Sequence, residues 1–277
     1  MTVLMFWNIG RRENGTAIGQ LCRKYDVDIL LLAESAMAST SLVTEINVAA
    51  GSSRTYWELP HLGSRVRAFT RYAPGFVETA FDDGHVKMLE LRPPIGVPLL
   101  IVAAHLPSKL WADSQKQSYR VRRLRQDIET QEAQRGHKNT VVIGDLNLNQ
   151  FEDALTAADG LHGVIDKTVA TRPPRTVDGQ AWGYFYNPMW SRMGDDSVGP
   201  SGTYWRAGSD LVTHFWNTFD QVLLRPSLLP YYDPRNLVVP DRVGESPILH
   251  MGGGGTGLSD HLPVVVALSI EREPGHG

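Results

Sequence analysis

Apolar residues occur in this chain as short unbroken runs that alternate with stretches of helical spacing. Unbroken runs of this length predict strands that are buried on both faces. They occupy residues 3–7, 29–33, 98–104 and 141–143. Between the first two runs, apolar positions recur as on one face of a helix, at Ile18, Leu21, Cys22 and Tyr25. Asn14 or Thr16 is the expected cap of that helix, and residues 39–50 predict a second one.

Shorter elements with an alternating pattern follow at residues 65–69, 75–79 and 85–91, and they predict antiparallel strands. Further strands are expected at residues 203–205, 219–224 and 263–270. A short helix is expected at residues 150–158. The simplest architecture is a four-layer α/β sandwich, in which two packed mixed β-sheets are flanked by helices. We expect a single domain over residues 1–272, with an aromatic-rich insertion at residues 162–216 and a tail at residues 273–277.

One further helix carries arginines opposite its apolar face. Val121, Leu124 and Ile128 recur at helical spacing. The arginines are Arg120, Arg122, Arg123 and Arg125. Such a run can contact a phosphate backbone, but it is more often the solvated face of a helix. We therefore expect most of these arginines to be solvated.

Composition narrows the class of protein. The chain has 277 residues, is 42% hydrophobic and carries a net charge of -3, which is typical of a globular fold. That charge gives no general attraction for nucleic acid, although a local basic groove remains possible. A single cysteine excludes an internal disulfide and suits a reducing compartment. The sequence shows neither a signal-peptide pattern nor a membrane-length apolar run, so we expect a cytoplasmic monomer without membrane contact.

Polar residues stand at the ends of the predicted strands. The set is Asn8, Glu34, His105, Asp145, Asn147, Asp220, Asp260 and His261. Each taken alone reads as an ordinary turn or capping residue. If the strands lie side by side, however, these ends converge, and clustered carboxylates repel one another unless a cation is present. A Mg²⁺ site with few carboxylates and several waters would resolve that repulsion.

The residues around these positions resemble the endonuclease/exonuclease/phosphatase superfamily, the DNase I-like and exonuclease III-like group. The pairing of Gly-Asp-x-Asn with a later Ser-Asp-His is specific, whereas each motif alone is weak. The matching segments are Trp7-Asn8-Ile9, Leu32-Ala33-Glu34, Ala104-His105-Leu106, Gly144-Asp145-Leu146-Asn147, Phe219-Asp220-Gln221-Val222 and Leu258-Ser259-Asp260-His261-Leu262-Pro263. The resemblance implies a DNase I-like fold across nearly the whole chain.

The resemblance also implies a role for each residue. Glu34 would be the main ligand of Mg²⁺ or Mn²⁺, assisted by Asn8 and Asp260. Asp145 would orient or deprotonate the attacking water. The remaining members would hold the water or donate to phosphate oxygens, and they are Asn147, His105 and His261, the last with its tautomer fixed by Asp220. Some relatives carry an acid where this chain has Gly10, so we expect a single ion.

The substrate is less closely defined than the reaction, because one fold serves many substrates. The tryptophan-cysteine-aspartate-arginine segment of inositol polyphosphate 5-phosphatases is absent near Asp220, which argues against a lipid phosphatase. Aromatic residues concentrated at 182–216, with Tyr204 and Trp205 among them, could stack on bases or pack the insertion. Arg172 and Arg175 lie in a proline-stiffened loop and are candidates for substrate contact. We therefore expect a nuclease whose partner is nucleic acid, with DNA favoured.

Other functions remain open at this point. One is a phosphomonoesterase, or a phosphodiesterase acting on phospholipid or a small molecule. The other is a catalytically silent binding protein. A silent protein would have no reason to retain several clustered acids, because such a cluster destabilises a fold without metal. This argument favours the enzyme.

Overall fold

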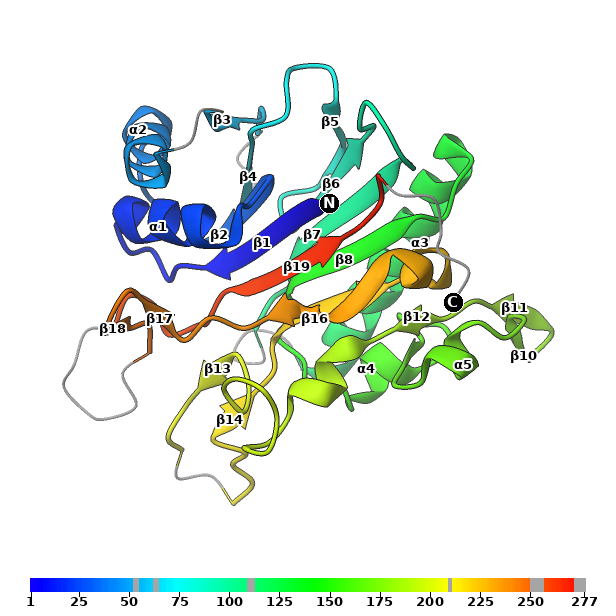
Figure 1. Cartoon of the computed structure of the whole chain (residues 1–277). Helices are drawn as coiled ribbons and strands as arrows, with labels where there is room; N and C mark the ends of the chain where they lie inside the picture. Colours follow the sequence, from blue (N-terminus) through cyan, green and yellow to red (C-terminus); the bar gives the residue numbers. More distant parts are fainter. Residues whose placement is uncertain (52–54, 62–64, 109–112, 209–210, 250–256, 272–277) are drawn as a thin grey trace.

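The computed structural model describes residues 1–51, 55–61, 65–108, 113–208, 211–249 and 257–271. Two large mixed sheets pack against each other, and helices lie outside them (Figure 1). This is the α/β sandwich predicted from the sequence. The predicted tail, residues 273–277, falls outside the described residues. No described helix is both long and apolar enough to cross a membrane.

The first sheet is built around the N-terminal strand. In spatial order its strands are β16 (Tyr232–Val238), β19 (Val264–Leu268), β1 (Thr2–Asn8), β2 (Ile29–Ala33), β4 (Val66–Thr70) and β3 (Trp57–Glu58). β1 pairs in parallel with β2 and antiparallel with β19. The parallel pair needs a crossover, and α1 (Gly15–Tyr25) supplies it. The first strand, β1, and the last strand, β19, therefore lie side by side in this sheet.

The second sheet contains the Gly-Asp-x-Asn strand. In spatial order its strands are β5 (Val77–Asp82), β6 (Val86–Leu91), β7 (Leu99–His105), β8 (Thr140–Asp145), β15 (Asp220–Leu224), β12 (Phe185–Tyr186) and β9 (Gly163–Val164). β7 and β8 are parallel and are joined by α3 (Ser114–Arg135). Two strands of the predicted insertion, β9 and β12, extend this sheet, so part of the insertion belongs to the sandwich itself.

Alternate residues of β8 enter two different cores. Val141 and Ile143 face the core between the sheets, which also contains side chains of β1, β2 and β19. Val142 faces the other way, into a cluster with Val121 and Leu124 of α3. A strand covered on both faces needs apolar residues at every position, which explains the unbroken Val-Val-Ile run. α2 (Ser39–Ala50) packs with α1 beside the first sheet (Figure 1).

Gly144 extends the strand that the apolar run predicted at residues 141–143. It lies inside β8, paired with the neighbouring strand β7. A Cβ atom at Gly144 would stand 2.1 Å from the carbonyl oxygen of Ala104, so any larger residue would force the two strands apart. The glycine is required by the close approach of two backbones, and the turn follows Asp145.

Some local predictions need correction. Asn14 occupies the N-cap position of α1, but its side chain donates to the carbonyl of Leu258 instead of capping the helix. The helix predicted at residues 150–158 is the single turn α4 (Asp153–Thr156). Arg125 is not solvated, because its guanidinium is buried and donates to the carbonyls of Gly160 and Gly183. Helical periodicity alone did not distinguish this arginine from its exposed neighbours.

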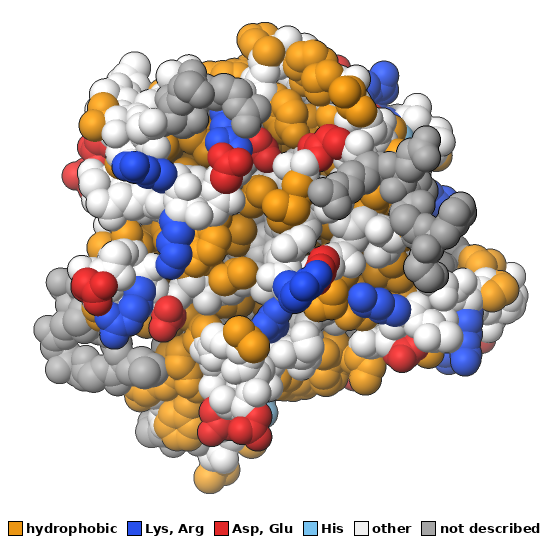
Figure 2. Space-filling view, in the orientation of Figure 1, with side chains coloured by type: hydrophobic (Ala, Val, Ile, Leu, Met, Phe, Trp, Pro, Cys, Tyr) orange, Lys and Arg blue, Asp and Glu red, His pale blue; other side chains and the backbone are white. Residues whose placement is uncertain are grey.

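Short elements complete the fold. They are α5 (Lys167–Ala170), β10 (Arg175–Val177), β11 (Gln180–Trp182), the 3₁₀ turns η1 (Pro188–Arg192) and η2 (Pro226–Tyr231), β13 (Tyr204–Trp205), β14 (Trp216–Asn217), β17 (Arg242–Val243) and β18 (Ser246–Pro247). On the face shown in Figure 2, basic and acidic side chains are interspersed with hydrophobic ones. No single charge dominates that face, in keeping with the small net charge.

Candidate active site

The strand directions bring the predicted polar residues to one edge of the sandwich. Four strands end at this edge, namely β1, β2, β7 and β8. The last residue of its strand, or the residue just after it, is in each case a predicted site residue: Asn8, Glu34, His105 and Asp145. β15 and β19 run antiparallel to these strands and therefore begin at the same edge. Asp220 consequently lies opposite Asp145 in the register of the second sheet. The convergence predicted from the sequence is thus a result of sheet topology.

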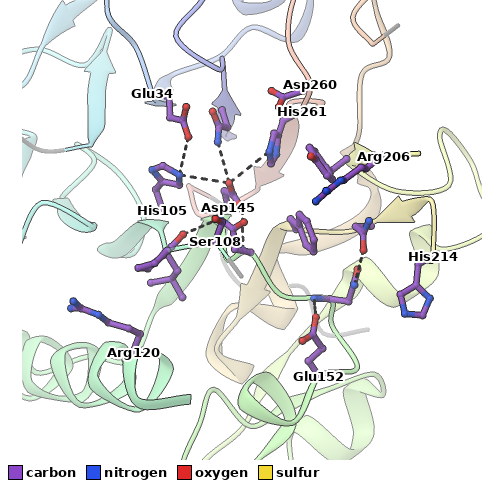
Figure 3. Close-up of a pocket in the computed structure, with 18 of the residues that line it drawn as sticks. Glu34, His105, Ser108, Arg120, Asp145, Glu152, Arg206, His214, Asp260 and His261 are labelled. Carbon is purple, nitrogen blue, oxygen red and sulfur yellow. Dashed lines mark hydrogen bonds and ion pairs between the residues drawn. The ribbon is translucent and has the colours of Figure 1, made fainter. Parts of the chain in front are cut away.

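Asp145 is the centre of the group (Figure 3). Its Oδ2 accepts a 3.1 Å hydrogen bond from Asn8 Nδ2, and its Oδ1 accepts a 2.9 Å bond from the backbone N–H of Asn147. The Nε2 atoms of His105 and His261 lie 3.8 and 3.9 Å from Oδ2. The carboxylate is thus held in one orientation between two imidazoles.

His261 is held by a buried carboxylate. Its Nδ1 lies 2.8 Å from Asp220 Oδ2, and its ring packs against Tyr204 with a centroid distance of 4.7 Å. Burial by itself lowers the pKa of His261, but the carboxylates of Asp220 and Asp145 outweigh burial and raise it to about 10. The ring is therefore an imidazolium at neutral pH, and Nε2 carries a proton that it can donate.

Glu34 lies at the open side of the group. Its side chain is 35% exposed, and its Oε1 is 3.4 Å from His105 Nε2. The hydrogen bond from His105 is the main cause of a lowered pKa, which the partial burial of the carboxyl group opposes. Glu34 also adopts a positive φ of 56°, an uncommon conformation for a residue with a side chain. An ionised carboxylate accessible to solvent suits a cation ligand.

Asp260 approaches the backbone beside the first strand. A Cβ atom at Gly10 would stand 2.9 Å from Asp260 Oδ1, and Gly10 has a φ of 54°. An acid at position 10, as expected for some relatives, would therefore collide with Asp260 unless the loop moved. The glycine leaves room for the Asp260 carboxylate next to Asn8. The contact with Asp260 explains why this chain has a glycine at position 10, where some relatives have an acid.

Asn147 reaches the site through a turn. An extended chain would place its side chain on the same side as that of Asp145, two residues earlier. Instead Asn147 has a φ of 52°, and its Nδ2 donates a 2.8 Å hydrogen bond to the carbonyl of Leu106. The chain turns sharply after Leu146, so the Asn147 amide still reaches the site, but by a turn and not by strand alternation.

A cavity of about 1080 Å³ opens over this group. Seven of the predicted site residues line it, and they are Asn8, Glu34, His105, Asp145, Asn147, Asp260 and His261. Asp220 lies behind His261 and is fully buried. Tyr204 also lines the cavity, whereas Trp205 pairs with Trp216 across the β13–β14 hairpin and is absent from the lining.

Arg172 and Arg175 are placed elsewhere. Both are exposed, Arg172 just before and Arg175 within the β10–β11 hairpin, and neither lines the cavity. Both arginines follow the Asp145 strand in the sequence, but they do not lie near Asp145 in space. The segment between them and β8 includes β9, which lies at the far edge of the second sheet. The expectation of substrate contact at these two residues has no support in their position.

Several lining residues were not predicted from the sequence. They are the basic residues Arg11, Arg65, Lys116 and Arg206 and the aromatic residues Phe151 and Phe219. Phe219 belongs to the segment that contains Asp220, but the others belong to no motif, and Arg65 and Lys116 come from segments that are distant in sequence. Arg120 was predicted as part of a basic helix face, and it does line the cavity. Only the fold could separate it from Arg122 and Arg123, which pair with Asp159 and Asp127.

A divalent cation fits this donor set. Among the described residues, Asp145, Asp220 and His261 bring ligand atoms within 4.8 Å of one another. Two of these are poor ligands here, because the Asp220 oxygen is engaged by His261 and the imidazolium has no free lone pair. Glu34, by contrast, is ionised and accessible. The oxygen atoms of Glu34, Asn8 and Asp260, which also line the cavity, suit a hard divalent cation better than those two poor ligands do.

Comparison with protein families agrees with this geometry. The model of the endonuclease/exonuclease/phosphatase family matches residues 5–261. The chain belongs to this family. Its members form a superfamily of hydrolases that act on phosphoester bonds. A search of curated protein sequences gives no match.

Solved structures show the same fold at low sequence identity. TDP2 of D. rerio, complexed with a single-strand DNA product, is 16% identical with a TM-score of 0.54, over 96% of this chain and 97% of that one. An AP endonuclease from Archaeoglobus fulgidus is 13% identical with a TM-score of 0.54, over 98% and 100%. The endonuclease domain of the TRAS1 retrotransposon is 11% identical with a TM-score of 0.52, over 98% and 99%.

Proposed function

We propose that this chain is a divalent-metal-dependent phosphodiesterase whose substrate is nucleic acid, with DNA favoured. The observation that carries the proposal is Asp145, fixed by hydrogen bonds from Asn8 and Asn147 and lying between the Nε2 atoms of His105 and His261. Hydrolysis of a phosphodiester needs a base for water and donors for the phosphate oxygens, and this group offers both within one cavity.

Asp145 would act as the general base. Its Oδ2 faces the cavity beside both imidazoles, while Oδ1 is occupied by the Asn147 N–H. A water held near Oδ2 would lose its proton to the carboxylate as it attacked the phosphorus in line with the leaving oxygen. The hydrogen bonds from Asn8 and Asn147 keep the acceptor oxygen aimed at that water without any reorganisation.

His261 and His105 would stabilise the charge that develops on the phosphate. His261 is the stronger donor, because Asp220 and Asp145 keep its ring protonated. Asp220 accepts the proton on Nδ1 and so leaves the Nε2 proton directed at the cavity. Tyr204 and Ser259 support this orientation, Tyr204 by packing on the ring and Ser259 through its Oγ, which accepts from the His261 backbone N–H at 3.1 Å.

Glu34, Asn8 and Asp260 would hold a single Mg²⁺ or Mn²⁺. The bound cation would supply charge neutralisation at a phosphate oxygen. The proposal of one ion rests on Gly10, which offers no side chain where a further ligand would be needed. The cations around the cavity favour an extended polyanion over a compact head group, which a closed pocket would suit better.

The test compares supercoiled plasmid, single-stranded DNA and RNA as substrates in Mg²⁺, with wild type, Asp145→Asn and an EDTA control. Asp145→Asn keeps the shape of the side chain but removes the base, so cleavage should fall on the order of 10²–10⁴-fold. Asp241→Asn, an exposed residue outside the cavity lining, is the matched control and should cleave normally. Cleavage that persists in EDTA or in Asp145→Asn would refute the proposed mechanism.

A further inference from the structure

The cavity lining contains a group of cations and, apart from it, a group of exposed aromatic rings. The cations are Arg65, Lys116 and Arg120, here called the cationic arm. The rings are those of Phe151, His214 and Phe215, here called the aromatic arm. Arg206 lies beside the rings, and its backbone N–H donates to the carbonyl of Phe215 at 2.8 Å. Figure 3 shows Arg120 and His214 on opposite sides of Asp145, so the proposed reaction centre lies between the two arms.

The cationic arm consists of charges without partners. Across the described residues, Arg65, Lys116 and Arg120 form no ion pair with an acid, whereas Arg122, Arg123 and Arg125 on the same helix as Arg120 are each paired. The three cations come from the loop before β4 and from α3. His85 lies between them, and its pKa is lowered by burial and further by the charges of Arg65 and Arg120. Unpaired cations gathered from separate elements suit consecutive phosphates.

The aromatic arm is presented by a strained turn. Phe215 has a φ of 58°, and the N–H of Trp216 donates to the carbonyl of His214 at 2.7 Å, so Phe215 is the centre of a three-residue turn. Such turns with positive φ are rare for residues with side chains, and strained backbone clusters at functional sites. The turn leaves Phe215 49% exposed, and Phe151 is 39% exposed. The edge of His214 packs on Phe151 with a centroid distance of 5.7 Å.

The turn is anchored to the reaction centre. Asn217, the last residue of β14, accepts a 3.0 Å hydrogen bond from Asn149, which follows Asn147 in the loop after β8. Asn149 also accepts from the Thr218 N–H at 2.9 Å. The exposed rings are therefore held at a fixed place relative to Asp145. Phe151 packs on Trp190 and His214, but Phe151 and Phe215 keep 39% and 49% of their surface exposed, which leaves ring surface available for a ligand.

We propose that the cavity binds single-stranded DNA, with the backbone of the strand on the cationic arm and an unpaired base stacked on Phe215. This inference rests on the proposed function, since it names the form of that substrate. Aromatic faces stack on any unpaired base, whereas the bases of a duplex are already stacked and are not available to Phe215. The two arms thus give the strand a direction across the reaction centre.

The test measures binding in EDTA, so that no cleavage occurs. The probes are fluorescein-labelled oligo(dT), a strand of the same length whose bases are replaced by abasic sites, and a duplex, followed by fluorescence anisotropy. Phe215→Ala should weaken oligo(dT) binding by about five- to 150-fold and leave binding of the abasic strand unchanged. Phe215→Trp should retain binding. Tyr119→Ala removes an aromatic ring that is 61% exposed outside the cavity lining and is the control.

The dependence of DNA binding on salt concentration distinguishes the cationic arm from the aromatic arm. Arg120→Ala should reduce the slope of log K against log salt concentration by about 0.7 for the phosphate contact it removes, while Phe215→Ala should leave that slope unchanged. Arg122→Ala removes the same charge from α3 outside the cavity lining and should not alter the slope. Equal binding of oligo(dT) by wild type and Phe215→Ala, or a preference for duplex, would overturn the inference even if the enzyme cleaves DNA. Binding as predicted without any cleavage would sustain the inference and sink the proposed function.

Discussion

At the scale of single residues, the site depends on how one buried pair shares a proton. Asp220 is fully buried and lies 2.8 Å from His261, so its charge has little solvent to screen it. Burial raises the pKa of Asp220, but the charge and hydrogen bond of His261 oppose that effect, and the short contact favours the ionised pair. The proposed donor role of His261 follows from this single neighbour. Other residues of the site act through position, Gly10 by making room and Asn147 by turning the chain.

This pair predicts a pH dependence. Activity that needs the imidazolium should decline as the pH rises toward about 10, the raised pKa of His261. In Asp220→Asn the main charge that raises this pKa is lost while burial still lowers it and Asp145 and Asp260 still raise it, so the alkaline decline should move to a lower pH. The measurement is kcat against pH for both enzymes, with Asp241→Asn as the control. An alkaline limb at the same pH in Asp220→Asn would show that Asp220 does not set the protonation of His261.

At the scale of secondary structure, different faces of α3 lie in three different environments. Its apolar side chains Val121, Leu124 and Ile128 cover the second sheet. Arg120 faces the cavity, while Arg125 is buried and donates to two carbonyls of the segment beside α4 and β12. A periodic pattern gives the face that packs on the sheet, but it does not reveal what other segments cover the remaining faces.

Arg125 therefore has a predicted structural role. Arg125→Met should lower the free energy of unfolding, because the carbonyls of Gly160 and Gly183 lose their donor and each unsatisfied buried acceptor costs about 1–3 kcal/mol. Arg123→Met on the exposed face should change stability by less than about 0.5 kcal/mol. Urea unfolding followed by circular dichroism measures both. If the two variants unfold at the same urea concentration, the guanidinium of Arg125 contributes nothing to the fold.

At the scale of the whole molecule, the sandwich brings four acids to one edge, Asp145 and Asp220 from two strands and Glu34 and Asp260 from two loops. Such a cluster opposes folding unless a cation neutralises it, so cation binding and stability should be linked. On the face shown in Figure 2 basic and acidic residues are dispersed, whereas the cavity lining gathers the acids Glu34, Asp145 and Asp260 and the cations Arg65, Lys116 and Arg120. The net charge of -3 conceals this local arrangement.

Thermal unfolding tests that linkage without any measurement of activity. Mg²⁺ at about a hundred times its Kd should stabilise the protein by about 2.7 kcal/mol, which corresponds to a rise in Tm of roughly 5–10 °C for a chain of this size. Glu34→Gln should lose most of this rise, while Glu13→Gln, an exposed acid outside the cavity lining, should keep it. A full rise in Glu34→Gln would place the cation on other ligands, of which Asp145 and Asp220 are the alternatives.

The sequence by itself determined the sandwich and predicted most of the residues that converge at its edge, because both predictions follow from local patterns. Unbroken apolar runs identify β2 and β8, and the polar residue that ends each run identifies Glu34 and Asp145. Tertiary structure alone decided what surrounds that centre. The cavity position of Arg65 and Phe151, the burial of Arg125, and the distance of Arg172 and Arg175 from the site depend on which segments fold beside one another. Such contacts join residues far apart in the chain, so no local pattern encodes them.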